Sequence, residues 1–267
     1  MQPVIKWSGS KRSQSKEIIK YFPTEINTYF EPFLGGGSML YMANPTNAVC
    51  GDICGPLIEM WKEIKENPDR LALEYEKRWK RLQAEGYEVY YQIRNSFNEN
   101  NNPYDFIFLS RTCVNGLIRF NSKGEFNNSL HHTRPGINPK TLANIIIDWS
   151  QHIQNVKFEC EDYRMLTKDA KKGDLVYLDP PYFHTKGRYY GTIDFQQFLE
   201  YLQDLNDREV KFILSFDGTG GDRDYIVEIP KELYKRHILI PSGHSTFKKV
   251  IDKKKEIVYE SLYLNWD

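Results

Sequence analysis

The tetrapeptide Asp179-Pro180-Pro181-Tyr182 is the part of the sequence whose residue types and spacing best suit a chemical reaction. It follows the apolar run 175–178, which predicts a buried strand, so it should lie at a carboxyl end of the sheet, where α/β folds bind ligands. Two prolines stiffen this turn and keep it out of a helix. The Asp179 carboxylate and the Pro180 carbonyl could each accept one hydrogen of an exocyclic amine, and Tyr182 offers a ring on which a base could stack. The pattern is suited to methyl transfer onto the amino group of a base.

An exocyclic amine on a base is a poor nucleophile, because its lone pair is delocalised into the ring. Two acceptors could turn that lone pair towards a methyl group on a positive sulfur, and neither a metal nor a strong general base is then required. Orientation of this kind can lower a barrier by roughly 7 to 11 kcal/mol. A base inside a duplex is out of reach, so it would have to be flipped out of the helix.

A glycine turn and an acid upstream predict an adenosine-containing cofactor. The β-rich run 28–34 breaks into Gly35-Gly36-Gly37 and resumes as a predicted helix over 38–43, and Asp52 follows a predicted strand over 48–51. Glycines let a ligand approach the main chain closely, and an acid at the end of the next strand can bind ribose hydroxyls. Neither GxGxxG nor a P-loop sequence is present, so these residues leave the identity of the cofactor open.

The rest of the chain predicts an α/β fold that is interrupted once. Residues 68–112 are predicted to be helical, and residues 115–139 form a basic, loop-like segment. Strands and helices then alternate again, over 156–160, 174–178, 194–206 and 210–216. Two late β-rich runs, 236–240 and 256–264, could close the sheet as an antiparallel pair.

Length and composition indicate an ordinary globular protein. The 267 residues are 40% hydrophobic and 27% charged, enough for one large α/β domain or one carrying an insertion. No apolar run is long enough to span a membrane and no secretory signal is evident, so a cytoplasmic location is expected. The four cysteines, Cys50, Cys54, Cys113 and Cys160, lack CxxC spacing and are predicted to be free buried thiols.

The formal net charge is zero, but the basic residues are clustered. Residues 1–23 hold five Lys or Arg against one acid, residues 111–140 five against one, and residues 231–255 eight against two. Such segments could follow a phosphate backbone, or they could be ordinary solvated faces.

Seven sequence blocks occur in the order found in one enzyme family. They are residues 6–11, 30–37, 51–52, 115–127, 161–163, 179–182 and 260–266. The chain resembles the Dam-type family of bacterial and phage DNA adenine methyltransferases over nearly its whole length. The resemblance implies a doubly wound, mostly parallel seven-stranded methyltransferase sheet with a mainly helical insertion. Residues 1–67 and 153–267 would form the catalytic domain and residues 68–152 the target-recognition domain.

The resemblance also implies the reaction, which is methyl transfer from S-adenosylmethionine to N6 of a flipped-out adenine in duplex DNA. Methylation of adenine in RNA, or of cytosine N4 in DNA, remains a rival, since the tetrapeptide suits any exocyclic amine. A nucleic-acid-binding regulator without activity and a nucleotide-dependent oxidoreductase are further alternatives.

Roles for the cofactor and the target base follow from the same resemblance. Trp7 and Lys11 would lie against the methionine end of the cofactor, and Phe33 and Gly35 would line its pocket. Asp52 would hold the ribose, and Asp162 would face the cofactor's adenine amino group. Asp179, Pro180 and Tyr182 would act on the flipped base, with Asp179 also beside the cofactor.

The DNA-facing residues implied by the resemblance are Lys6, Asn115, Arg119 and Asn121. Arg119 would read a base pair in the major groove, a task that suits arginine because it can pair bidentately with guanine. No metal site is expected, because His131 and His132 have no further ligand at suitable spacing. The segment 128–136 departs from the family pattern, so the target sequence is not predicted. A cognate restriction endonuclease is a candidate partner.

Overall fold

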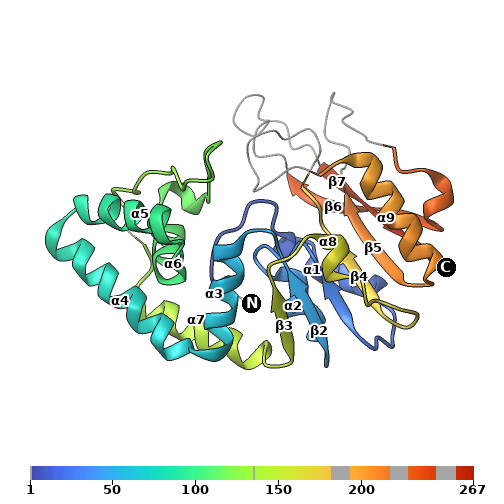
Figure 1. Cartoon of the computed structure of the whole chain (residues 1–267), viewed down its shortest axis with the longest axis horizontal. Coiled ribbons are helices and arrows are strands. Elements are labelled where there is room, and N and C mark those ends of the chain that lie inside the picture. The colour runs from blue at the N-terminus through green and yellow to red at the C-terminus, as the bar shows by residue number, and fades with distance from the viewer. Residues whose placement is uncertain (1, 135, 182–192, 217–227, 245–256) are drawn as a thin grey trace.

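Within the residues that the structure describes, seven strands form one mixed sheet (Figure 1). The computed structural model describes residues 2–134, 136–181, 193–216, 228–244 and 257–267. The strands are β1 (Tyr29–Glu31), β2 (Ala48–Gly51), β3 (Val156–Glu159), β4 (Leu175–Leu178), β5 (Lys211–Phe216), β6 (Arg236–His244) and β7 (Ile257–Leu264). Their order is β3-β2-β1-β4-β5-β7-β6; the first five run parallel, and β7 is antiparallel to β5 and β6. The predicted α/β fold with a mostly parallel seven-stranded sheet is confirmed.

The position of β4 at the middle of the sheet explains why its sequence is apolar without interruption. Leu175 and Tyr177 belong to the hydrophobic core on one face of the sheet, and Val176 and Leu178 belong to the core on the other face. A strand that is buried on both faces has no polar side to alternate with. Because β4 pairs with β1 and β5, the residues that follow it emerge at the middle of the sheet.

Helices cover both faces of the sheet. On the side of the first core lie α1 (Ser15–Ile18), α2 (Ser38–Ala43) and α3 (Gly55–Glu66); on the side of the second lie α8 (Tyr163–Leu166) and α9 (Phe195–Asp207). The sequence near residues 13–21 predicts one short amphipathic helix, and this prediction is wrong in detail. The chain there forms 3-10 turns, Lys11–Ser13 and Ile19–Tyr21, on either side of α1.

A helical region extends from the sheet beyond α3 (Figure 1). It consists of α4 (Pro68–Glu85), α5 (Glu88–Asn100), α6 (Pro103–Thr112) and α7 (Pro139–His152). The first three confirm the helical prediction for residues 68–112, whereas α7 was not anticipated. One hydrophobic core runs without a break from the sheet into these helices, so the division into two domains stays a prediction. No helix in the described ranges is long and apolar enough to cross a membrane.

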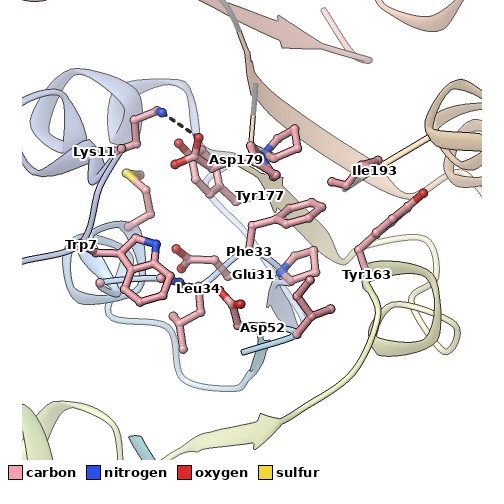
Figure 2. Close-up of a pocket in the computed structure, with 18 of the residues that line it drawn as sticks. Trp7, Lys11, Glu31, Phe33, Leu34, Asp52, Tyr163, Tyr177, Asp179 and Ile193 are labelled. Carbon is pink, nitrogen blue, oxygen red and sulfur yellow. Dashed lines mark hydrogen bonds and ion pairs between the residues drawn. The ribbon is translucent and has the colours of Figure 1, made fainter. Parts of the chain in front are cut away.

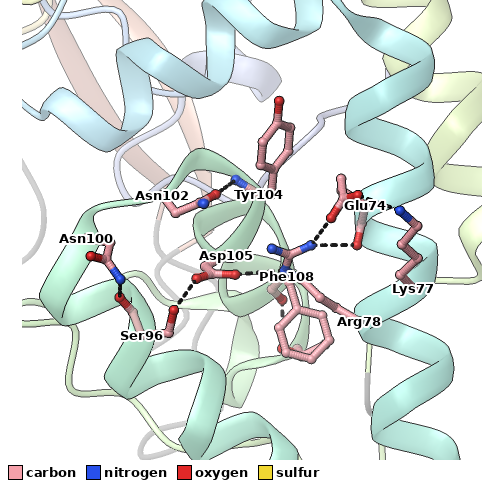
Figure 3. Close-up of polar contacts among 10 residues, drawn as sticks. Glu74, Lys77, Arg78, Ser96, Asn100, Asn102, Tyr104, Asp105 and Phe108 are labelled. Carbon is pink, nitrogen blue, oxygen red and sulfur yellow. Dashed lines mark hydrogen bonds and ion pairs between the residues drawn. The ribbon is translucent and has the colours of Figure 1, made fainter.

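A polar network fastens α4, α5 and α6 together (Figure 3). Arg78 of α4 donates from Nε to Asp105 of α6 at 2.7 Å, and Ser96 of α5 donates to the other oxygen of Asp105 at 3.0 Å. Arg78 also contacts Glu74 one turn away at 2.6 Å. Since Asp105 is only 4% exposed, this carboxylate joins three helices at one buried point.

A hairpin-like segment, residues 113–130, projects from the helical region (Figure 1). Antiparallel bridges join Cys113 to Leu130 and Phe120 to Phe126. Phe126 and Leu130 are buried in the core, whereas Arg119 is exposed. We call this segment the 113–130 hairpin; its apolar side chains anchor it and leave its charged ones at the surface.

The cysteines are free, as predicted, but not all of them are buried. Cys50, Cys54 and Cys113 are buried, whereas Cys160 is exposed. The burial predicted for Cys160 is therefore wrong, because it lies just beyond the end of β3, where the chain leaves the sheet.

Candidate active site

A pocket opens at the carboxyl ends of the parallel strands (Figure 2). Its walls come from the N-terminal loop, the turns that follow β1, β2, β3 and β4, and the start of α9. The lining residues are Trp7, Ser8, Gly9, Ser10, Lys11, Glu31, Pro32, Phe33, Leu34, Gly35, Gly36, Ser38, Met39, Asp52, Ile53, Asp162, Tyr163, Arg164, Tyr177, Asp179, Pro180, Pro181, Ile193, Asp194 and Gln197. Every cofactor-binding residue predicted from the sequence lies in this pocket.

The glycine turn lies directly against the indole of Trp7. Gly35 has φ +47°, and a Cβ placed on it would lie 2.5 Å from Cδ1 of Trp7, well inside contact distance. The carbonyl of Gly35 accepts a hydrogen bond from Nε1 of Trp61 at 3.1 Å, which fixes the turn from behind. Backbone geometry and space therefore both require glycine at position 35.

Asp52 faces the pocket from the turn after β2. Its carboxylate accepts hydrogen bonds from the backbone N–H of Gly35 at 3.2 Å and of Cys54 at 3.0 Å. Burial raises the pKa of Asp52 to about 6, although these hydrogen bonds oppose the shift. The next residue, Ile53, is 43% exposed and adds an apolar surface to the pocket that the sequence analysis did not single out.

Asp162 lies where the chain enters α8. Its side chain accepts from the backbone N–H of Arg164 at 3.0 Å and from Nε of Arg164 at 2.8 Å, so it caps this helix. Beside it, the rings of Phe33 and Tyr163 lie 5.6 Å apart between centroids. Capping the helix and lining the pocket are compatible, because a carboxylate can accept more hydrogen bonds than the two it receives here.

Asp179 forms a partly buried ion pair with Lys11, drawn as a dashed line in Figure 2. Nζ of Lys11 lies 2.7 Å from Oδ1 of Asp179 and 2.7 Å from Oε1 of Glu260, and Lys11 is only 5% exposed. Burial raises the pKa of Asp179 to about 6, which Lys11 opposes and Glu260 reinforces. Pro180 lines the pocket beside it. Tyr182, the last residue of the tetrapeptide, lies outside the described residues.

Three buried polar residues at this site were not predicted. Glu31 is 3% exposed, accepts a hydrogen bond from the hydroxyl of Tyr29 at 2.8 Å, and has its pKa raised by burial to about 8. The hydroxyl of Tyr177 is buried without a hydrogen-bond partner within the described ranges. Glu260 is 4% exposed on β7. The signal was an acid inside an apolar run, at residues 29–34 and 257–264, since a buried acid needs a partner or a function.

The predicted DNA-facing residues do not line this pocket. Lys6 packs on Gly116, where an added Cβ would lie 2.7 Å from Cδ of Lys6. Asn115, the residue before Gly116, is exposed and has φ +58°. Arg119 is exposed on the 113–130 hairpin. Asn121 uses its side chain within the hairpin, accepting from the backbone N–H of Glu125 at 3.0 Å and donating to the Glu125 carboxylate at 2.7 Å.

Comparison with known proteins identifies the family. Residues 7–245 match the model of the D12 class N6 adenine-specific DNA methyltransferases. The chain belongs to this family. The methyltransferase is 30% identical to the type II methyltransferase M.MjaIII of Methanocaldococcus jannaschii, over all of this chain and 99% of that protein. It is 28% identical to the DNA adenine methylase of Escherichia coli, over 92% of this chain and 91% of that one.

The resemblance to Dam-type enzymes is therefore confirmed, and the chain is an adenine-specific DNA methyltransferase. The family assignment sets aside cytosine N4, RNA, an inactive regulator and an oxidoreductase as its function, and it implies that the methyltransferase uses S-adenosylmethionine. A solved rRNA methyltransferase, aviRa from Streptomyces viridochromogenes, covers 99% of this chain and 90% of its own, with a TM-score of 0.45 and 9% identity. That likeness is too low to bear on function.

Proposed function

We propose that the pocket binds S-adenosylmethionine and that Asp179 and Pro180 position N6 of an adenine flipped out of duplex DNA for methylation. One observation carries this proposal. Asp179 follows β4 in the same pocket as the glycine turn and Asp52, so the methyl donor and the acceptor amine would meet at one edge of the sheet.

The charges of the pocket suit a cation. Among the described lining residues, the acids outnumber the bases: they are Glu31, Asp52, Asp162, Asp179 and Asp194 against Lys11 and Arg164. S-adenosylmethionine carries a positive sulfonium and an ammonium group, which acids stabilise, whereas the pyrophosphate of a dinucleotide would be repelled.

The shape and hydrogen bonding of the pocket fit the same molecule. Glycines at positions 35 and 36 leave backbone bare beside Trp7, and the hydroxyl of Tyr177 is a buried donor that a ligand could satisfy. In the proposed complex, Asp52 accepts hydrogen bonds from the ribose, and Phe33 and Ile53 contact the adenine ring.

Two other residues have proposed contacts with the cofactor. Asp162 accepts a hydrogen bond from the cofactor's adenine amino group, and Trp7 closes the methionine end. Lys11 lies near that end, with its ammonium fixed on Asp179 and Glu260. Lys11 therefore acts on the cofactor's surroundings mainly through these two acids.

The chain's part in the transfer is to orient the acceptor amine. Asp179 and the Pro180 carbonyl each accept one N6 hydrogen, so that the lone pair of N6 points towards the methyl group. The bound cofactor supplies an electrophilic methyl group on a positive sulfur. Asp179 stabilises the positive charge that N6 acquires with the methyl group. The charge is lost when N6 releases a proton to water. Tyr182, outside the described residues, is proposed to stack on the flipped base.

The DNA-facing surface is proposed to include Lys6, Asn115 and Arg119. Lys6 and Asn115 lie side by side where the N-terminal loop meets the 113–130 hairpin, and the guanidinium of Arg119 is free to reach a guanine edge. Asn121 supports this proposal less directly, because its hydrogen bonds shape the hairpin. A chromosomal or phage DNA substrate would place the enzyme in the cytoplasm of a bacterium.

The proposal is tested by methylation of unmethylated duplex DNA, followed by nucleoside analysis. We expect N6-methyladenine from the wild type and a loss of at least about a thousandfold from Asp179→Ala, because orientation and charge stabilisation both depend on this carboxylate. Calorimetry should show that the variant still binds S-adenosylmethionine. Asp207→Ala, at an exposed acid at the end of α9, is the matched control. Full activity of Asp179→Ala would overturn the assignment.

A finer proposal concerns a partner. Since a relative covering the whole chain is named a type II methyltransferase, we propose that this enzyme protects DNA from a cognate restriction endonuclease. Sequencing the methylated adenines in DNA from expressing cells gives the target site. An endonuclease encoded nearby should then cut that site in unmethylated DNA only; cleavage at a different sequence would contradict the pairing.

A further inference from the structure

Glu260 lies two strands away from the strand that precedes the tetrapeptide, but it contacts the same lysine, Lys11, as Asp179 does. Glu260 is on β7, which pairs with β5, the neighbour of β4. Its Oε1 lies 2.7 Å from Nζ of Lys11 and accepts a hydrogen bond from the hydroxyl of Ser215 at 2.6 Å. Its Oε2 accepts one from the side-chain amide of Gln14. Glu260 is therefore held in place from three directions, and it fixes one side of the Lys11 ammonium.

The Lys11 ammonium contacts one of the two carboxylate oxygens of Asp179. Lys11 donates to Oδ1 of Asp179. No hydrogen bond to Oδ2 is present within the part of the chain that the structure describes. Glu260 holds the other side of this lysine and so keeps it at Oδ1, and none of the described residues covers Oδ2.

We propose that Glu260 is a positioning residue for methyl transfer, which holds the Lys11 ammonium between two carboxylates and so sets the orientation and the charge of Asp179. The inference rests on the proposed role of Asp179 as the acceptor of an N6 hydrogen. It adds a residue from the far end of the chain that does not itself touch the substrate.

Among the described residues, four titratable groups face Asp179 from four elements. They are Lys11 in the N-terminal 3-10 turn, Glu31 at the end of β1, Tyr177 on β4 and Glu260 on β7. Lys11 lowers the pKa of Asp179 and Glu260 raises it. Removing the charge of Glu260 removes a negative neighbour that raises the pKa of Asp179, so this pKa should fall.

The decisive measurement is a carboxyl ¹³C NMR titration of Asp179 in protein without added ligand. In Glu260→Gln we expect Asp179 to titrate about 1 pH unit lower than in the wild type. Glu260→Asp keeps the negative charge and should restore most of the wild-type value. Glu209→Gln removes an exposed acid paired with Lys172 and should leave the titration unchanged.

The kinetic consequence separates positioning from simple support of the fold. In Glu260→Gln we expect kcat to fall about tenfold or more, with KM for S-adenosylmethionine within about threefold of the wild type. The acid limb of the pH profile should move to lower pH together with the Asp179 titration. A residue that only supports the fold would lower thermal stability without moving that limb.

Two outcomes overturn the inference. One is an unchanged Asp179 titration in folded Glu260→Gln. The other needs no variant: in the wild type, the carboxyl signal of Asp179 should show more than one protonation step, and a single independent step would contradict the coupling of Asp179 to its neighbours. Because the titration requires neither cofactor nor DNA, it reports on Glu260 even if the proposed methyl transfer fails.

Discussion

The pocket and the 113–130 hairpin would meet the substrate in opposite ways. In the pocket, acids and a lysine lie buried or partly buried at strand ends and hold one another, as Lys11 does with Asp179. On the hairpin, Arg119 is exposed, and the local hydrogen bonds of Asn121 shape the backbone that presents it. In the proposed function, the reaction would depend on groups that folding has already fixed, whereas target reading would depend on exposed groups of the hairpin.

This difference separates two kinds of mutational effect. Buried partners interact strongly and depend on one another, so a change at one position of the pocket should disturb several steps of the reaction. Exposed side chains in water contribute less before binding, so a change on the hairpin should alter DNA binding alone. The predictions below test this contrast.

Among the variants that compare the two regions, the largest effect is expected from Gly35→Ala. The new Cβ would lie 2.5 Å from Trp7 in a backbone with φ +47°, so binding of S-adenosylmethionine should weaken by about a hundredfold. Gly124→Ala on the hairpin is a matched control: it has φ +78° but no atom within 4 Å of the added Cβ. Calorimetry should show normal cofactor binding in the control. Equal losses in both variants would mean that backbone strain alone, rather than the contact with Trp7, is responsible.

Arg119→Ala tests the hairpin in the same way, because it should affect DNA binding and leave the pocket unchanged. Loss of a bidentate contact to a base should raise KM for DNA by about ten- to a hundredfold and relax the choice of sequence. Cofactor binding should not change. Lys123 is an exposed neighbour on the same hairpin. Lys123→Ala should weaken binding to all DNA sequences by about the same factor, and this factor should be smaller than the one for Arg119→Ala. Unchanged sequence preference in Arg119→Ala would remove this residue from base reading.

The pH dependence should come from the pocket. The pKa of Asp179 is raised to about 6, mainly by burial, and its ionised carboxylate is the proposed acceptor. Activity should therefore be constant above this pH, be lost as pH falls through it, and be about tenfold lower at pH 5. DNA binding measured by anisotropy in the same buffers separates chemistry from association. A rate that stays constant down to pH 5 would exclude Asp179 as the controlling group.

The smallest effect on turnover is expected from the helical region. Asp105→Asn weakens the junction of α4, α5 and α6 and should lower the free energy of unfolding by about 2 kcal/mol, while kcat at 25 °C stays near wild type. Urea unfolding and a methylation assay on the same preparation measure both quantities. Ser122→Ala, at an exposed hairpin position, serves as a control for stability. A large loss of kcat would mean that this junction supports the catalytic geometry directly.

Local sequence signals were enough to predict much of the fold. The apolar run of β4, the glycines after β1 and the acid after β2 each act within a few residues, and α2 and β2 have the predicted bounds. The helix α7 was missed because composition extended the loop prediction up to residue 139, although Asn138 and Pro139 are an N-cap and a first helical residue.

Contacts between distant parts of the chain could not be predicted. The motifs brought Lys11, Asp52 and Asp179 to one place, but nothing near Lys11 in the sequence indicates that Glu260 is its second partner. Likewise, Asn121 was expected to face DNA, and its hydrogen bonds to Glu125 became visible only once the hairpin was formed. Pairing across a sheet depends on topology, which no short motif contains.

The raised pKa values of the pocket link cofactor binding to protons. Burial raises the pKa of Glu31 to about 8 and that of Asp52 to about 6, so at neutral pH the empty pocket retains part of its protons. A cation entering beside these acids favours their ionised forms and displaces those protons into the buffer. In the proposed complex, the affinity for S-adenosylmethionine therefore rises with pH across the neutral range. The product, S-adenosylhomocysteine, keeps the ammonium group but has an uncharged sulfur, so it should favour the ionised acids less than the substrate does.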